Sequence, residues 1–174
     1  TKRKIIKLFD DFSKLDEMID GFKAGQLITV GAGTGIGKSA FAVNLALNIT
    51  AEGHKVGLWS FEMDKEEIFQ RILSNKSGHY RKSHRLEERY NACRDYLDNT
   101  DDDISLFTTP IKDLSNFFLQ CRKLSIQDGM KVVIIDYLQL IHLNQDYGTN
   151  RVGEIELITN SLKLMASELG ITVV

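Results

Sequence analysis

The sequence predicts an α/β fold in which a mostly parallel sheet is flanked by helices on both faces. Apolar segments typical of buried strands alternate along the chain with segments of helical periodicity, a pattern that indicates strands joined by crossover helices. A glycine-rich turn at residues 32–39 joins the first strand to a helix, and four β-branched residues at 132–135 lead into Asp136. The 174 residues are enough to bury one substantial core.

The expected strands are short apolar runs rich in β-branched residues. In chain order they are residues 26–31, 55–60, 104–107, 131–136 and 171–174. The expected helices show apolar residues three and four positions apart. They cover residues 12–19, 40–49, 64–75, 85–98, 110–124 and 155–169.

Local signals place several helix boundaries. Asp64 and Glu67 have the spacing of a capping box, and Pro110 favours a helix start. Gly53 and Gly170 follow the periodic segments and favour helix ends. The polar stretches at 77–85 and 142–152 are expected to be loops. We expect residues 1–25 to form a linker segment and residues 26–174 one domain that is incomplete at its C-terminus.

Composition excludes a membrane-embedded or strongly basic protein. Apolar residues make up 43% of the chain, charged residues 26%, and the net charge is −2. Any contact with nucleic acid therefore requires a local patch or an assembly. With no apolar run of membrane-spanning length, we expect a soluble cytoplasmic protein, with Cys93 and Cys121 as reduced, packed thiols.

The turn from Ala32 to Ser39 has the pattern of a phosphate-binding P-loop, except that Ala32 stands where glycine is usual. Its glycines allow successive N–H groups to point into one concavity, where they bind phosphate oxygens. Lys38 then contacts the terminal phosphates, and the Ser39 hydroxyl ligates Mg²⁺. The alternative is a merely flexible turn that contains a lysine. The expected nucleotide-binding residues in this segment are Ala32, Gly33, Thr34, Gly35, Ile36, Gly37, Lys38, Ser39 and Ala40.

Four further side chains are candidates for the same site. Asp136 ends a buried strand, a position where a carboxylate can hold Mg²⁺ through water. The alternative is that Asp136 only caps a turn. Glu62 follows the second strand and is placed either to activate an attacking water or to favour the next helix dipole. Gln139 either senses the terminal phosphate or is an exposed loop amide, and Arg71 either contacts phosphate or faces solvent.

A basic group precedes the helix expected at 85–98. It consists of Lys76, His79, Arg81, Lys82, His84 and Arg85. It is interpreted as a nucleic-acid contact or, more commonly for such a composition, as a solvated loop. The histidines do not have the spacing of a zinc site.

In this order, the motifs resemble those of a known family. They are Phe12-Ser-Lys-Leu-Asp16, the 32–39 loop, Ser60-Phe-Glu-Met63, Asp136-Tyr-Leu-Gln-Leu140 and Arg151 with Glu154. Together they resemble the C-terminal, RecA-like ATPase domain of DnaB-type replicative DNA helicases of bacteria or their phages. Alanine at the first P-loop position is common in that family.

The resemblance implies an ATP- or other NTP-driven motor that moves 5′ to 3′ on single-stranded DNA and unwinds duplex DNA. It implies a homo-hexameric ring, with primase and a helicase loader as partners. By matching positions it makes Lys38 and Glu62 catalytic, Asp136 and Ser39 the Mg²⁺-linked residues, Arg71 a nucleotide-pocket residue and Gln139 a coupling residue. The 142–152 loop would face the central channel.

Three other functions remain open at this point. A RecA-like recombinase or another P-loop ATPase shares the phosphate-binding loop, as does a small-molecule kinase. The chain by itself is also consistent with a nucleotide-binding module that has no motor activity. Filaments instead of rings would favour the recombinase, and phosphate transfer to a nucleoside would favour the kinase.

We predict that the 174-residue chain binds ATP but hydrolyses it slowly and unwinds no DNA. The resemblance places the arginine finger and much of the DNA-contacting loop beyond residue 174, and such a finger accelerates hydrolysis by roughly a thousandfold or more. Phosphate-release and strand-displacement assays, with and without single-stranded DNA, test this. Rapid, DNA-stimulated unwinding would contradict the prediction.

Overall fold

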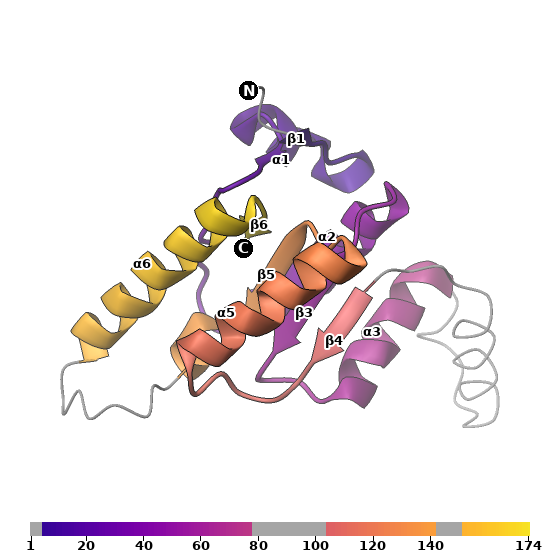
Figure 1. Cartoon of the computed structure of the whole chain (residues 1–174). Coiled ribbons are helices and arrows are strands. Elements are labelled where there is room, and N and C mark those ends of the chain that lie inside the picture. Colours follow the sequence, from indigo (N-terminus) through magenta and orange to yellow (C-terminus); the bar gives the residue numbers. More distant parts are fainter. Residues whose placement is uncertain (1–4, 78–103, 142–150) are drawn as a thin grey trace.

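The structure, a computed structural model, describes residues 5–77, 104–141 and 151–174. Its centre is a four-stranded parallel sheet in the order β4-β3-β5-β6 (Figure 1). The strands are β3 (Val56–Ser60), β4 (Ile104–Phe107), β5 (Val132–Asp136) and β6 (Thr172–Val173). The two central strands pair in register from Val56 with Val132 to Ser60 with Asp136.

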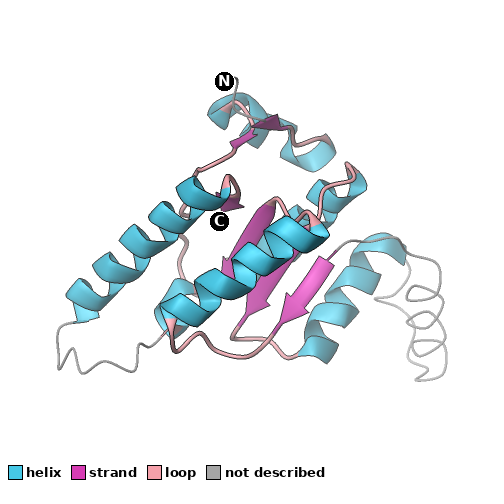
Figure 2. Ribbon diagram, in the orientation of Figure 1, coloured by secondary structure: helices cyan, strands magenta, loops and turns pink. Residues whose placement is uncertain are grey.

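Helices cover both faces of this sheet (Figure 2). They are α2 (Lys38–Ala51) and α3 (Lys65–Ser77) on one face, and α5 (Leu114–Lys123) and α6 (Arg151–Leu169) on the other. Leu58 and Ile134 pack with α2, whereas Trp59 and Val133 pack with α5 and α6. This alternation confirms the predicted α/β fold with a parallel sheet between two helical layers.

Trp59 joins two strands and a helix on the α5 face. Its indole stacks on Phe107 of β4 at 4.3 Å between ring centroids and meets Phe117 of α5 edge-on at 5.1 Å. The ring lies so close to Gly57 that a Cβ there would be 2.4 Å from the indole. Glycine at this position therefore permits the packing of the aromatic cluster.

Most predicted elements are confirmed, with boundaries shifted by a few residues. The Asp64 carboxylate accepts a hydrogen bond from the Glu67 N–H at 2.8 Å at the start of α3, as the capping spacing predicts. Cys121 is a free, fully buried thiol, and burial raises its pKa to about 12. A thiol with such a pKa stays protonated and behaves as a small core residue.

The predicted strand at 26–31 is wrong in extent. Only Leu27 forms a bridge, to Val173 of β6, through hydrogen bonds from Ile28 N to Val173 O and from Val173 N to Gln26 O. β6 is two residues long, and within the part of the chain that the structure describes no bridge pairs residues 29–31. Thr29 leaves the sheet and is exposed.

The predicted helix start at Pro110 is also wrong. Residues 111–113 are not helical, the Ile111 side chain is buried in the core, and α5 begins at Leu114. The Asp113 carboxylate caps the helix by accepting hydrogen bonds from the N–H groups of Ser115 and Asn116. After Lys123 the chain continues as one π-helical segment, Leu124–Asp128, which Gly129 ends at a φ of 77°.

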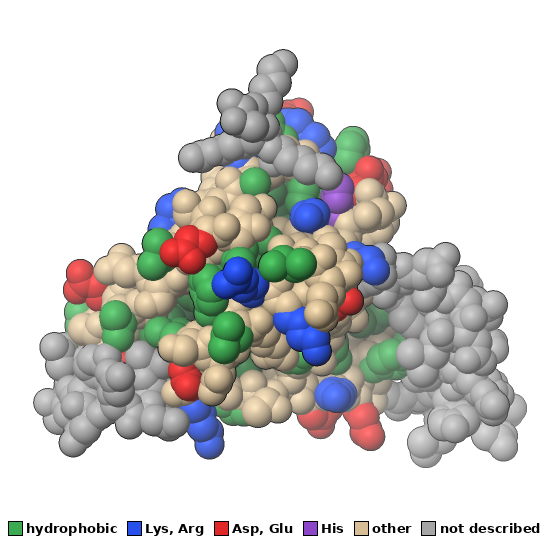
Figure 3. Space-filling model, viewed as in Figure 1, with side chains coloured by type: hydrophobic (Ala, Val, Ile, Leu, Met, Phe, Trp, Pro, Cys, Tyr) green, Lys and Arg blue, Asp and Glu red, His purple; other side chains and the backbone are tan. Residues whose placement is uncertain are grey.

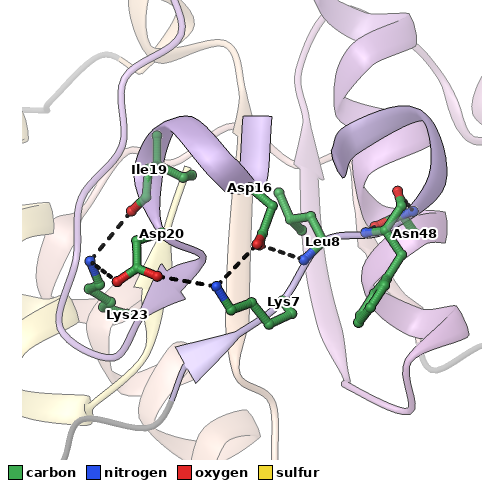
Figure 4. A network of polar contacts seen from close by, with 8 residues as sticks. Lys7, Leu8, Asp16, Ile19, Asp20, Lys23 and Asn48 are labelled. Carbon is green, nitrogen blue, oxygen red and sulfur yellow. Dashed lines mark hydrogen bonds and ion pairs between the residues drawn. The ribbon is translucent and has the colours of Figure 1, made fainter. Parts of the chain in front are cut away.

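Residues 5–25 pack closely against the P-loop helix. They form β1 (Ile5–Ile6), a 3₁₀ turn (Asp10–Phe12), α1 (Ser13–Ile19) and β2 (Phe22–Lys23), with β1 and β2 antiparallel. The Asn48 side chain of α2 both donates to and accepts from the Phe9 backbone, at 3.0 and 3.2 Å (Figure 4). The described part of the predicted linker segment thus shares the core of the domain, and a boundary at 25/26 stays a prediction.

Ion pairs hold this N-terminal unit together (Figure 4). Lys7 lies 3.2 Å from both Asp16 and Asp20, and Lys23 also reaches Asp20 at 3.2 Å. The hydrogen bond from Lys7, and then that from Lys23, lowers the pKa of Asp20. The Asp20 side chain is exposed, so its two pairs contribute little to stability, whereas the Asp16 side chain is mostly buried.

Several predictions lie outside the described residues. They are the helix at 85–98, Cys93, the basic side chains from His79 to Arg85, and most of the 142–152 loop. Two loop boundaries were wrong, because Ser77 belongs to α3 and residues 151–152 belong to α6.

The molecular surface is mixed in character. None of the described helices is long and apolar enough to cross a membrane. Figure 3 shows the face that carries α5, where basic and hydrophobic side chains lie among acidic ones without forming one large patch of a single charge.

The Asp113 cap gives a test of where α5 starts. We predict that Asp113→Ala lowers the free energy of unfolding by about 1 kcal/mol, because two N–H groups in the first turn lose their acceptor. Asp113→Asn keeps an acceptor and is expected to stay within about 0.5 kcal/mol of wild type. Urea unfolding followed by circular dichroism measures both variants. Equal stability of the alanine and asparagine variants would contradict this start.

Candidate functional site

A cavity of about 750 Å³ opens at the carboxyl ends of the parallel strands. The P-loop and the first turn of α2 form one wall, and the end of β5 with the turn after it forms another. The candidate side chains that line it are Lys38, Ser39, Glu62, Arg71, Asp136 and Gln139. The structure thus brings together residues that lie far apart in the sequence.

The backbone of the P-loop has the features of an anion site. Residues 31–37 are exposed, and Gly35 and Gly37 have φ values of 76° and 106°, in the region that favours glycine. Gly37 is the N-cap of α2, and no side chain caps the helix there. The N–H groups of the first turn and the helix dipole are therefore directed toward the cavity, where they favour a bound anion.

The Lys38 side chain folds back over this loop. Its ammonium donates hydrogen bonds to the carbonyl oxygens of Ala32 and Gly33, each at 3.1 Å. The charge is consequently held at the mouth of the phosphate-binding turn, next to Ser39. A phosphate group in this turn would meet both an ammonium and a row of backbone donors.

Asp136 supplies a buried carboxylate to the opposite wall. The residue is 4% exposed, and its Oδ2 atom has no hydrogen-bond partner. A buried carboxylate oxygen without a partner is costly unless a ligand or water occupies its acceptor sites. This orphaned oxygen, in the same cavity as the Ser39 hydroxyl, fits the oxygen chemistry of a hydrated Mg²⁺.

The described residues contain no group of three His, Cys, Asp or Glu side chains that could hold a metal by themselves. Mg²⁺ is usually bound by one or two protein oxygens together with substrate phosphates, and the Ser39 hydroxyl and the Asp136 carboxylate in this cavity are oxygens of that kind.

Three exposed side chains complete the candidate set. Glu62 lies in the turn after β3, Arg71 on α3 and Gln139 in the 3₁₀ turn Leu138–Leu140. All three line the cavity. Each can therefore contact a bound ligand, and their roles stay predictions.

The site differs from the predicted one in detail. Gly33 and Ile36 belong to the P-loop but do not line the cavity, and the Ile36 side chain is 75% exposed. The lining residues that were not predicted include Tyr137 beside the end of β5 and Thr159 from α6. No sequence pattern marks Thr159, because its place in the cavity depends on how α6 packs.

Arg151 ties the Gln139 turn to α6. Its guanidinium donates to the carbonyl oxygens of Gln139 at 2.5 Å and Ile141 at 3.0 Å, and it forms an ion pair with Glu154. The buried Glu154 carboxylate holds the Arg151 side chain from within α6, and the two hydrogen bonds of Arg151 to carbonyl oxygens join the first turn of the helix to the turn after β5. The sequence offers Arg151 and Glu154 only as part of a motif, without this contact.

The sequence matches the family described as DnaB-like helicase C terminal domain over residues 8–174. The replicative DNA helicase DnaB of Geobacillus stearothermophilus is 32% identical, over 94% of this chain and 37% of that protein. The DnaB protein of Nostoc sp. is 34% identical, over 94% of this chain and 19% of that protein. The chain thus spans well under half the length of these relatives.

Solved structures agree with this family. The structure of a DnaB-like replicative helicase and its interactions with primase superposes with a TM-score of 0.78 at 26% identity, covering 98% of this chain and 42% of that one. A second solved structure, described as an ATPase domain, gives 0.76 at 26% identity, covering 99% and 64%. A KaiC-like protein of Pyrococcus horikoshii, at 0.63 and 19% identity, shares the fold. Because the family match covers residues 8–174, the chain belongs to the family of DnaB-like helicase C-terminal domains.

Proposed function

We propose that this chain is the ATPase portion of a replicative DNA helicase. The observation that carries the proposal is the cavity that gathers Lys38, Ser39, Glu62 and Asp136 at one edge of a parallel sheet. Backbone donors and a lysine suit the phosphates of ATP or another NTP. The Glu62 carboxylate, in the turn after β3, lines the same cavity and is the candidate base for hydrolysis.

Each side chain has a proposed task in hydrolysis. Ser39 and Asp136 would hold Mg²⁺, Asp136 through a water ligand, and the ion would neutralise phosphate charge when bound. Lys38 exchanges its carbonyl partners for phosphate oxygens. Glu62 accepts a proton from the attacking water, and Arg71 binds phosphate from the α3 side of the cavity.

The proposed activity of the whole protein follows from its relatives. Proteins named replicative DNA helicases match this chain, and one solved relative is described with its interactions with primase. We propose a cytoplasmic homo-hexamer that moves 5′ to 3′ on single-stranded DNA, with primase and a helicase loader as partners. A RecA-like recombinase is not favoured, because the matched family is that of the helicases.

Gln139 is proposed to couple the nucleotide to the DNA-binding part of the ring. Its side chain lines the cavity, while its carbonyl is held by Arg151 at the start of α6. A shift at the nucleotide would therefore be passed to the segment between Ile141 and Arg151. The resemblance places that segment beside the DNA.

Two substitutions separate binding from hydrolysis. We predict that Lys38→Ala weakens ATP binding by about 10- to 100-fold, because a charge-assisted contact to phosphate is lost. Glu62→Gln is expected to bind ATP within about threefold of wild type and to lower turnover by about a hundredfold or more. Calorimetry and phosphate release measure the two effects. Lys112→Ala, an exposed lysine between β4 and α5, is the matched control.

Each substitution has an outcome that would contradict the proposed role of its residue. Unchanged turnover in Glu62→Gln would remove Glu62 as the base. Unchanged ATP affinity in Lys38→Ala would remove the P-loop as the phosphate site and leave the cavity without its proposed ligand.

Removal of the Arg151 contact is expected to loosen the Gln139 turn. We predict that Arg151→Ala lowers the free energy of unfolding by roughly 2 kcal/mol, because two carbonyl groups and a buried carboxylate lose a charged donor. Urea unfolding measures the change, with Arg122→Ala, an exposed arginine of α5, as control. Equal effects of the two substitutions would show that the contact does not stabilise the domain.

A further inference from the structure

Ser60 has an unusual environment for a hydroxyl. It is the last residue of β3, it is fully buried, and its Oγ atom has no hydrogen-bond partner. Among the described residues, the only other buried side-chain oxygen or nitrogen in this condition is Oδ2 of Asp136. Buried polar atoms are almost always paired, so two exceptions in one place point to a shared function.

The two side chains are neighbours on the same face of the sheet. Ser60 and Asp136 are register partners at the carboxyl ends of β3 and β5. The hydrogen bond from Phe61 N to Asp136 O, at 2.9 Å, extends the pairing past this point and fixes the register. By the alternation along each strand, both side chains lie on the face that carries α2 and the P-loop.

Their chemistry is complementary. A serine hydroxyl has one proton to donate and rotates about χ1, whereas an ionised carboxylate only accepts. Asp136 lines the nucleotide cavity. Ser60 does not line the cavity itself, and Asp136 is its register partner there.

We propose that Ser60 is a positioning residue for Asp136. The two atoms are not bonded to each other in this structure; a rotation of Ser60 about χ1 in the loaded site would let its hydroxyl donate to the Asp136 carboxylate and leave the other carboxylate oxygen for the water ligands of Mg²⁺. Residues that orient a metal-linked carboxylate in this way commonly change metal affinity by about tenfold or more. The inference rests on the proposed function, because it takes Mg²⁺–ATP as the ligand of the cavity.

The test is the Mg²⁺ dependence of ATP binding by the 174-residue chain, measured by calorimetry without turnover. Ser60→Ala is expected to raise the Mg²⁺ concentration for half-maximal enhancement of ATP binding by about tenfold or more. Its ATP affinity in EDTA should stay within about twofold of wild type, because the P-loop contacts are untouched. Ser60→Thr keeps the hydroxyl and should stay within about threefold of wild type in Mg²⁺ dependence.

Matched variants keep the result interpretable. Ser161→Ala removes a half-buried serine from α6, on the other face of the sheet, and should leave the Mg²⁺ dependence unchanged. Thermal unfolding checks that Ser60→Ala is folded. If it is not, Ser60→Cys, which is similar in size but only a weak donor, should show the same shift in Mg²⁺ dependence.

The outcomes separate this inference from the proposed function. A wild-type chain whose ATP binding does not depend on Mg²⁺ would overturn the metal part of the proposed function, and the role of Ser60 with it. Mg²⁺-dependent binding that is unchanged in folded Ser60→Ala or Ser60→Cys would overturn the role of Ser60 alone. Equal shifts in Ser60→Ala and Ser60→Thr would show that packing, and not the hydroxyl, is responsible.

Discussion

The parallel pairing of β3 with β5 is the constraint on which the rest of the molecule depends. It runs in register from Val56 with Val132 and ends with Ser60 beside Asp136. One face of the pair receives α2 and thus fixes where the P-loop stands, while the other holds Trp59 against α5. A slip of one residue would exchange the faces and move Asp136 away from the cavity.

The elements that the sequence predicts well are those whose pattern is strictly local. The apolar run before Asp136 and the spacing of Asp64 and Glu67 are sufficient for β5 and for the start of α3. The predicted boundaries are wrong where contacts with residues distant in the sequence determine where an element starts or ends. The segment after Leu27 lies outside the sheet beyond its bridge to Val173. Ile111 is buried in the core, and α5 begins only at Leu114, after the Asp113 cap.

The candidate site follows the same division. Lys38, Asp136 and Glu62 are predicted because a motif or a strand end marks them, and the cavity contains all three. Ser60, Arg151 and Thr159 acquire their places through strand register or helix packing, which no spacing along the chain encodes. Ile36 is the opposite case: it belongs to the P-loop motif and was predicted for that reason, but its side chain faces solvent.

The hydrogen bonds that Lys38 makes within its own loop affect which ligands it can bind. Lys38 already has two carbonyl acceptors in the loop, so a ligand gains from it only by offering oxygens that are better acceptors than a peptide group. The charged oxygens of terminal phosphates are better acceptors of this kind. A nucleoside or a monophosphate that does not reach the ammonium would leave Lys38 bonded to the Ala32 and Gly33 carbonyl oxygens. Under the proposed function, the loop would therefore favour nucleotides whose phosphate chain is long enough to reach the Lys38 ammonium.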